Sequence, residues 1–598
     1  MVTCPSWNPL RLCVPSQNGL VAEPPHLHST TTSAGLPSFR GGGVNSRPSG
    51  VTIRTGPSMI SGPFDLGVMV TWVIAANIAA RFPRRRGISG VRGLFLVLCA
   101  GVVACIGERG PLTNRMAHSP TTYLARAARQ PVRWQPWGRD AFTLAAKLDR
   151  PILLYVGSDT CHWCAETDRA IYTDPEIGAL INTLFVPVRV DRDERPDVAQ
   201  RYQAAVERLA GLRGWPLTVF LTADGSAFFG GTYFPADDPI TGRGLKQLLP
   251  EVAKSYREQR SFVVQQAARV RELVLTGNRE LSGTLRPSLV QQGIVDVRRD
   301  LDEAVRSRTV AGNVMDAQAA SLLLRDTTAR ASALRALDFM LDTTAGVAGE
   351  DPPGLVRAAL VGTVAEAWIV TGDNHYREAG RALVRSLADE LPSADHASSG
   401  GSQAVFTDQE AYIIEKVLLA AATLGESTAT RRARAALDGV LLRTYARGWG
   451  VRHSVAPGPR DSGTPPGLLQ DQVEMALACI AAHQVSGEGG YLDVALDLAA
   501  VTESGYADPA GGYFDIADAA PSSLPGLADR TKHVLDDVLP GANAGTALLL
   551  ARLAQVTGDQ AYRRRAQRTL EAFVGAISGT GVRAATYLAA ARETLQIP

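Results

Sequence analysis

The sequence predicts an α/β domain followed by a large all-helical domain. Short apolar runs typical of buried strands, such as 151–157 and 184–190, alternate with helical patterns between residues 119 and 262. From about Pro287 onward strand signals nearly vanish, and Ala, Leu and Arg recur at helical spacing. The length of 598 residues also exceeds that of one ordinary domain, so two or more packed units are expected.

The composition favours a folded protein and excludes several classes. Hydrophobic residues make up 45% of the chain and charged residues 20%. The net charge of +2 provides no strong field, so we expect no nucleic-acid partner. Among the seven cysteines only Cys161 and Cys164 have C-x-x-C spacing, which is not the pattern of a disulfide-stapled scaffold. A structural zinc site needs a second ligand pair, and since none follows we expect neither a metal nor another cofactor.

The N-terminal region has the order of a secretory signal. The first part of residues 1–86 is rich in Ser, Pro, Gly and Thr, so we interpret this segment as disordered or as wrongly translated upstream sequence. Within 87–105 basic residues precede a short apolar run that ends in Val102-Val103-Ala104-Cys105. This tetrapeptide resembles the bacterial lipobox, which implies lipidation at Cys105. A non-cleaved anchor is the alternative; both predict export to the periplasm or cell envelope, with the membrane contacted only through the N-terminus.

The centre of the α/β domain is the run Cys161-His162-Trp163-Cys164. A predicted strand ends at Gly157, three residues suited to helix capping follow, and the dithiol opens the next helix. A thiolate at a helix N-terminus meets unpaired N–H groups, which lowers its pKa. We therefore expect Cys161 to attack and Cys164 to resolve the mixed disulfide.

The two residues between the cysteines leave alternatives open. His162, when protonated, either stabilises the thiolate or is a surface histidine without a role. Trp163 either shields the pair from water or fills a groove.

Further motifs follow along the chain. The predicted strand 184–190 ends next to Asp191, Trp215-Pro216 precedes a strand at 217–222, and Asp224-Gly225 predicts a hairpin turn into 227–229. Together with the dithiol these motifs resemble a family of thioredoxin-domain proteins once named for a domain of unknown function, DUF255, which includes the spermatogenesis-associated thioredoxin-like proteins. The segments that carry the resemblance are Asn114-Arg115, Pro131-Val132, Trp134 to Phe142, Cys161 to Cys164, Val190 to Asp197, Gly214-Trp215-Pro216 and Phe229 to Pro235.

The resemblance implies a thioredoxin-like domain over 119–262, flanked by linkers at 106–118 and 263–286. It implies a cis Pro216 packed against the dithiol, with Trp215 and Asp191 as further supporting residues. The histidine that the family has after the second cysteine is Ala165 here, which argues against metal binding.

Residues 287–598 resemble, within this family, an (α/α) toroid of the kind shared with six-hairpin glycosidases and sugar epimerases, here expected to be shortened and divergent. Sugar chemistry would need paired carboxylates or a histidine facing a cavity. Acidic residues near helix starts are usually caps, so whether this domain binds a sugar stays open. The candidates are Asp408, Glu410, Asp471, Glu474, Asp536, Asp537 and His533.

Three functions remain from the sequence. The first is a thiol-disulfide oxidoreductase that acts on protein thiols or disulfides, with the helical domain binding the substrate or partner. The second is a carbohydrate-active toroid whose thioredoxin-like domain is structural or regulatory. The third is a redox-sensing binding module without turnover.

Overall fold

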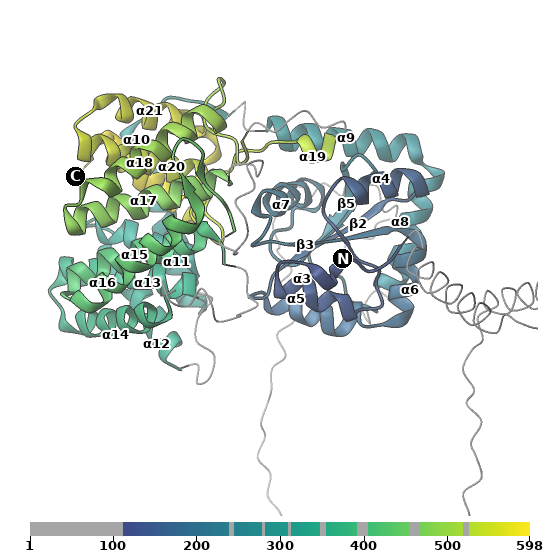
Figure 1. Cartoon of the computed structure of the whole chain (residues 1–598), viewed down its shortest axis with the longest axis horizontal. Coiled ribbons are helices and arrows are strands. Elements are labelled where there is room, and N and C mark those ends of the chain that lie inside the picture. The colour runs from purple at the N-terminus through teal and green to yellow at the C-terminus, as the bar shows by residue number, and fades with distance from the viewer. Residues whose placement is uncertain are drawn as a thin grey trace, which may run out of the picture. The chain divides into compact units, whose positions relative to one another are not determined.

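The computed structural model describes residues 112–237, 244–277, 281–308, 313–346, 354–391, 405–454, 467–517 and 525–597. The predicted upstream and signal-like segments, and with them the lipidation candidate Cys105, lie outside the described residues. The described part contains a mixed β-sheet domain followed by a larger helical domain (Figure 1).

A five-stranded sheet forms the centre of the first domain. The strand order is β1, β3, β2, β4, β5; β1 and β2 run parallel to β3, while β4 is antiparallel to β2 and β5 antiparallel to β4. The predicted strands and the predicted hairpin are confirmed to within about two residues. The strands are β1 (Gln135–Pro136), β2 (Ile152–Gly157), β3 (Val186–Asp191), β4 (Leu217–Leu221) and β5 (Ala227–Gly231).

Side chains of β2 alternate between two separate hydrophobic cores. Leu153 and Tyr155 pack with α6 and α8, whereas Ile152 and Leu154 pack with α4 and α7. Both faces of the strand are therefore covered, which explains its continuous apolar run. The helices are η1 (Met116–His118), α3 (Thr122–Arg126), η2 (Ala127–Arg129), α4 (Arg139–Leu148), α5 (His162–Thr167), η3 (Asp168–Tyr172), α6 (Pro175–Leu184), α7 (Pro196–Ala210) and α8 (Leu245–Glu258).

The sheet domain extends beyond the boundaries expected from the sequence. Helix α9 (Arg260–Thr276) runs through the first half of the segment predicted as a linker. It buries Val263 and Ala267 in one core and Val270 in the other. At the N-terminal side Met116, within the other predicted linker, is also fully buried. Both segments belong to the packed domain.

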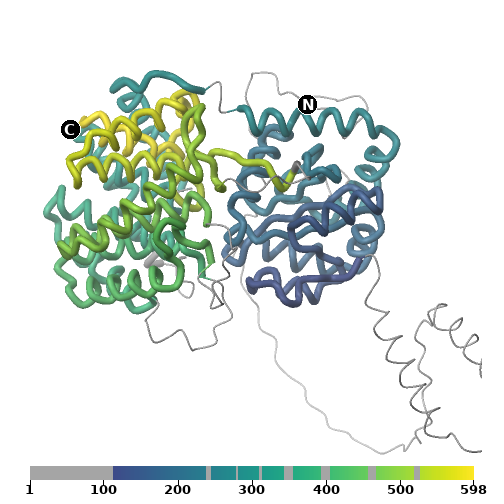
Figure 2. The backbone as a smooth tube through the Cα atoms, turned by 45° about the horizontal axis from the view of Figure 1, so that its top comes forward, coloured from purple at the N-terminus to yellow at the C-terminus, as the bar shows by residue number. Residues whose placement is uncertain are grey.

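Twelve of the described helices pair in sequence order into six hairpins in the helical domain. Figure 2 shows these helices running side by side. Six inner helices contact one another in a closed ring: α11 (Val314–Leu324), α13 (Gly354–Thr371), α15 (Thr407–Leu424), α17 (Leu469–Ser486), α20 (Ala542–Thr557) and α22 (Ala585–Leu595). The outer helices are α10 (Pro287–Ser307), α12 (Arg330–Gly346), α14 (Asn374–Glu390), α16 (Ser427–Thr444), α18 (Gly489–Tyr506) and α21 (Gln560–Glu571). Because each inner helix follows an outer one, the inner helices all begin at the same end of the ring.

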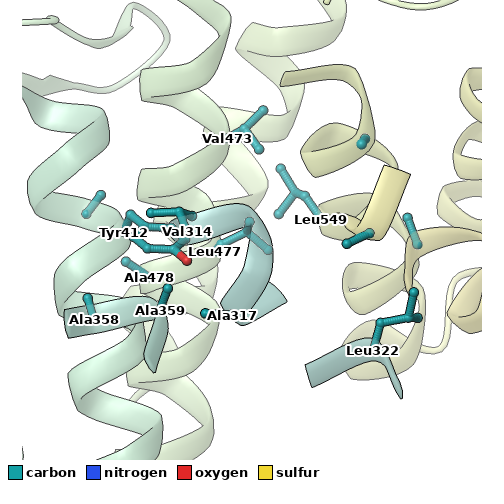
Figure 3. Packing of buried hydrophobic residues seen from close by; sticks show 14 of the residues in the cluster. Val314, Ala317, Leu322, Ala358, Ala359, Tyr412, Val473, Leu477, Ala478 and Leu549 are labelled. Carbon is teal, nitrogen blue, oxygen red and sulfur yellow. The ribbon is translucent and has the colours of Figure 1, made fainter. Parts of the chain in front are cut away.

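Small side chains allow the inner helices to approach one another closely. Figure 3 shows Ala317, Ala359 and Ala478 beside the larger Tyr412 and Leu477, all of them buried in one hydrophobic cluster. Helix α13 is long and apolar enough to span a membrane, with a mean hydropathy of 1.4, but half of it is buried. Its place in the ring explains its apolar composition.

One segment of the helical domain packs against the sheet domain. It comprises α19 (Pro525–Ala528) and Asp529, whose side chain is 7% exposed. Arg271 donates through Nε to Asp529 at 2.8 Å, and Arg201 donates to the carbonyl oxygen of Gly526 at 2.8 Å. Asp529 also lies 3.7 Å from Arg201, so one carboxylate serves two arginines.

We expect Asp529→Asn to lower the free energy of unfolding by about 2 to 4 kcal/mol, since two arginines lose their buried counter-charge. Calorimetric unfolding of the full chain measures this change. Asp493→Asn, which alters an exposed aspartate of α18, is the matched control. Equal melting temperatures for the two variants would contradict a stabilising role of this contact.

Candidate active site

Cys161 and Cys164 lie at the beginning of α5 and form a disulfide. Strand β2, a turn, the dithiol and the helix follow one another in the predicted order. Cys161 is itself the N-cap residue, because its Sγ accepts a hydrogen bond from the backbone N–H of Cys164 at 3.1 Å. The prediction that the three preceding residues cap this helix is therefore wrong: a sulfur takes the place of a capping oxygen.

The two sulfur-bearing residues differ in their access to solvent. Cys161 is half-buried, whereas Cys164 is fully buried. Cys164 packs against the end of β2: a Cβ atom added to Gly157 would lie 2.9 Å from the Cys164 Sγ and closer still to the Tyr123 hydroxyl. The Cys164 sulfur can therefore occupy its position only because residue 157 has no side chain.

An aromatic rim lies beside the dithiol. Trp163 is 57% exposed, with its ring 5.8 Å from that of Tyr233 and 5.6 Å from that of His162. Tyr233 is also exposed. Trp163 therefore presents a flat apolar surface to solvent next to the reactive pair.

Two more of the predicted supporting residues, Trp215 and Pro216, lie in the loop before β4, and Arg192 lies in the loop after β3. The Trp215–Pro216 peptide bond is cis, as the resemblance implies, and Pro216 is buried. The Arg192 guanidinium lies 5.2 Å from the Trp215 ring and donates a hydrogen bond to Thr160, the residue before Cys161, at 3.3 Å. Arg192 thus connects both loops to the dithiol turn.

Asp191 lies at the end of β3, directly opposite Gly157 of β2. Neighbouring residues in parallel register point to the same face of a sheet, so the Asp191 side chain projects on the side where Cys164 packs against Gly157. Asp191 is 4% exposed and accepts a hydrogen bond from the backbone N–H of Asp193 at 3.0 Å. Burial, with Asp193 nearby, raises the pKa of Asp191 to about 7.

A buried ion pair behind this site was not found from the sequence. Arg189 is 1% exposed and donates two hydrogen bonds to Asp168, at 2.7 and 2.6 Å. Its guanidinium also lies 4.1 Å from the centre of the Tyr123 ring. Burial raises the pKa of Tyr123 well above its usual value, and its hydroxyl has no hydrogen-bond partner among the described residues. The sequence feature that could have indicated this ion pair is a single arginine within an otherwise apolar predicted strand.

In the helical domain two of the predicted acidic residues meet at one place. Asp408 and Asp471 lie near the starts of α15 and α17, and His453 lies between them, with Nδ1 2.9 Å from Asp471 and 3.9 Å from Asp408. Although burial opposes it, the two carboxylates raise the pKa of His453 to about 10. His453 Nε2 lies 2.9 Å from the backbone oxygen of Asp193 in the sheet domain. Among the described residues these three side chains are close enough to bind a metal ion, but as a protonated histidine between two acids they already satisfy one another.

Asp536, Asp537 and Glu410 lie outside the cluster around His453. Asp536 is fully buried and accepts hydrogen bonds from the backbone N–H groups of Gly541 and Thr586, at 2.9 and 2.8 Å. Asp537 lines the same hollow as Asp408, beside Arg192 and Trp215. Burial raises the pKa of Glu410 to about 7.

His533 binds Asp515 at 2.6 Å, in a second histidine-carboxylate pair. Asp515 was not among the candidate site residues predicted from the sequence. Glu474 instead lines the interior of the ring.

Comparison with known proteins places the sheet domain in a family. Residues 113–275 match the family described as "Protein of unknown function, DUF255", with the model name Thioredox_DsbH. The sheet domain is thus similar to this family over nearly its whole described length. This match confirms the resemblance inferred from the sequence motifs.

Relatives of the DUF255 segment cover only part of either chain. Human spermatogenesis-associated protein 20 is 38% identical over 174 residues, which is 28% of this chain and 22% of the human protein. The mouse protein is 38% identical over 162 residues, 27% of this chain and 20% of the mouse protein. The matched segment thus spans about a fifth of the length of these relatives.

Solved structures with a partial likeness have low identity. An unsaturated glucuronyl hydrolase specific for heparin is 12% identical, with a TM-score of 0.39, covering 52% of this chain and 96% of its own. The Lin0763 protein from Listeria innocua is 14% identical, with a TM-score of 0.36, covering 48% of this chain and 85% of its own.

We expect Gly157→Ala to destabilise the oxidised protein by about 1 to 3 kcal/mol, because the new methyl group must displace Cys164 or Tyr123. Denaturant unfolding of the full chain measures this change. Gly439→Ala in α16 is the control: the nearest atom to the new Cβ would be the Arg443 Nη1 at 3.4 Å, and alanine favours the helix. A Gly157→Ala protein as stable as the wild type would show that Cys164 is not held against β2.

Proposed function

We propose that this protein is a thiol-disulfide oxidoreductase with a thioredoxin-like fold. The observation that carries the proposal is the pair Cys161 and Cys164. Cys161 is half-buried and its sulfur accepts a backbone N–H, whereas Cys164 is fully buried. A hydrogen bond to the thiolate form lowers the pKa of a thiol. This supports Cys161 as the attacking group.

In the proposed reduction of a substrate, the Cys161 thiolate attacks one sulfur of a substrate disulfide. A mixed disulfide forms, and the released substrate thiolate takes a proton from water. Cys164 then loses its proton and attacks the Cys161 Sγ, which forms the Cys161–Cys164 disulfide and releases the second substrate thiolate. Two electrons pass to the substrate, and the reverse sequence oxidises a dithiol.

Asp191 is the proposed acceptor for the Cys164 proton. It projects on the same side of the sheet as the buried sulfur, and its pKa of about 7 allows it to gain or lose a proton near neutrality. In the closed core bulk water cannot readily take this role.

The helical domain is proposed to position the substrate or partner protein. A hollow of about 300 Å³ is lined by Thr160 and Arg192 next to the dithiol and by Asn313, Gly354 and Gln409 of the helical domain. The exposed Trp163 and Tyr233 add an apolar surface for a substrate segment.

Export is part of the same proposal and rests on the sequence pattern before Cys105 alone. Determination of the mature N-terminus tests it.

Alkylation trapping tests the redox activity. We expect Cys164→Ser to accumulate mixed disulfides that Cys161→Ser does not form, because only the outer thiolate attacks, and each variant to lose at least about 100-fold of the rate of insulin reduction. Cys479→Ala, which alters a buried cysteine of α17, should behave as the wild type. Mixed disulfides without any turnover by the wild type would instead indicate a redox sensor, and equal trapping by both serine variants would contradict the assigned roles.

The raised pKa of Asp191 predicts a specific pH dependence of stability. An unfolded aspartate has a pKa near 4, so between about pH 4 and 7 the folded protein holds this proton more tightly than the unfolded chain does. The wild type should therefore lose stability relative to Asp191→Asn as pH rises through this window, by at least about 1.4 kcal/mol, the equivalent of one pKa unit. Urea unfolding at pH 4.5 and 7.5 measures the difference. The same comparison with Asp493→Asn should show no such change, and a pH-independent difference for Asp191→Asn would refute the buried, proton-holding role.

A further inference from the structure

The inner helical ring encloses a lumen, lined by both apolar and charged side chains, that the proposed redox function does not use. All six inner helices line it, and its volume is about 270 Å³. Its lining reaches from Ala585, at the start of α22, to the last turns of α13 and α15, at Ile369 and Thr423. Because Ile369 is exposed, the lumen opens toward the C-terminal ends of the inner helices.

Two cations in the lumen share one carboxylate. Arg552 of α20 donates to Glu415 Oε1 at 2.7 Å, and Lys416 of α15 donates to Glu415 Oε2 at 2.9 Å. The Glu415 side chain is only 1% exposed, whereas those of Lys416 and Arg552 are 23% and 21% exposed. All three side chains line the lumen, and the two cations are more accessible than the carboxylate between them.

The second carboxyl group at this level does not offset the extra cation. Glu474 of α17 is fully buried; its Oε1 accepts a hydrogen bond from Gln470 at 2.6 Å, and its Oε2 has no partner among the described residues. Burial, together with the charge of Glu415, raises the pKa of Glu474 to about 8. A neutral Glu474 leaves Glu415 alone against Lys416 and Arg552.

The remaining charges of the lumen are balanced. Near the mouth Arg325 and Arg592 are matched by Glu366 and Glu593, and Arg325 lies 2.5 Å from Glu366. The helix C-termini at the mouth carry partial negative charge, which disfavours an anion there. The surplus positive charge is therefore located deeper, between Lys416 and Arg552.

We infer that the lumen binds a small organic anion, with a carboxylate or phosphate group held by Lys416 and Arg552. A volume of about 270 Å³ suits a small metabolite. Gln318 and Thr586, hydrogen-bonded to each other at 3.3 Å, provide further polar groups at the closed end.

Titration calorimetry of the full chain at pH 7 in 150 mM KCl tests this inference. The probes are succinate and inorganic phosphate, which distinguish the two anionic groups, with 1,4-butanediol and 1,4-diaminobutane as neutral and cationic counterparts of succinate. We expect saturable binding of at least one anion and none of the diol or diamine. Binding of the diamine or diol, or of neither anion at 10 mM, would overturn the inference.

Variants identify the site. Lys416→Met should weaken anion binding at least tenfold, while Glu415 keeps Arg552 as its partner. Lys254→Met, which alters an exposed lysine of α8, should bind as the wild type. Unchanged binding by Lys416→Met would place the anion elsewhere and overturn the inference.

A pH series gives a readout that a folding defect would not mimic. The titratable groups that act on Glu474 are Tyr412, Glu415, Lys416 and Asp408 of α15, and Arg552 of α20 lines the same lumen. As pH rises from 7 to 9, ionisation of Glu474 adds a negative charge, so the affinity of the wild type should fall several-fold. Glu474→Gln should bind the anion and lack this fall; loss of binding in Glu474→Gln with its fold intact would overturn the neutral role of Glu474.

Discussion

The candidate site depends on the parallel pairing of β2 and β3, whose carboxyl ends lie side by side. This register puts Gly157 opposite Asp191. The missing side chain at Gly157 makes room for the inner sulfur, and the carboxyl group of the neighbouring strand projects on the same side. The loop after β3 then brings Arg192 to Thr160 and Trp215. A one-residue shift of this register would turn Asp191 to the opposite face and remove the proposed proton acceptor from the buried thiol.

Much of the sheet domain could be predicted because its signals are local. Apolar runs predicted β2, β3 and β4, Asp224-Gly225 predicted the hairpin, and the C-x-x-C spacing predicted the dithiol. What escaped prediction depends on residues distant in sequence. Arg189 pairs with Asp168, 21 positions earlier in the sequence, and its guanidinium lies over the Tyr123 ring. The pattern of a strand does not indicate which partners a buried arginine has. The capping sulfur was also missed, since cysteine is not among the residues preferred at that position.

In the helical domain, too, local sequence patterns explain where helices end and begin, but they do not show which distant side chains meet. Gly372, Gly425, Gly487 and Gly558 adopt positive φ at helix ends, and Asp373 and Asp559 cap the helices that follow. Glu426 and Glu488, at the corresponding positions, make no capping bond. The acidic residues near inner-helix starts were predicted as a set, but His453, which joins Asp408 and Asp471, comes from a loop without a distinguishing pattern. Lys416 and Arg552 lie in the interiors of different helices, 136 residues apart by their numbers, so their meeting at Glu415 needs the closed ring.

Two of the buried charged clusters described above, at Arg189 and at Glu415, differ in a way that bears on their roles. Arg189 and Asp168 match one cation with one carboxylate in a two-bond geometry, and aromatic rings cover the guanidinium, so the pair is complete. Two cations converge on Glu415, and the neighbouring Glu474 is held neutral by burial. Because burying an uncompensated charge costs several kcal/mol, a folded protein retains such a surplus only where water or a ligand reaches it. The open lumen provides that access, whereas the space around Arg189 is filled.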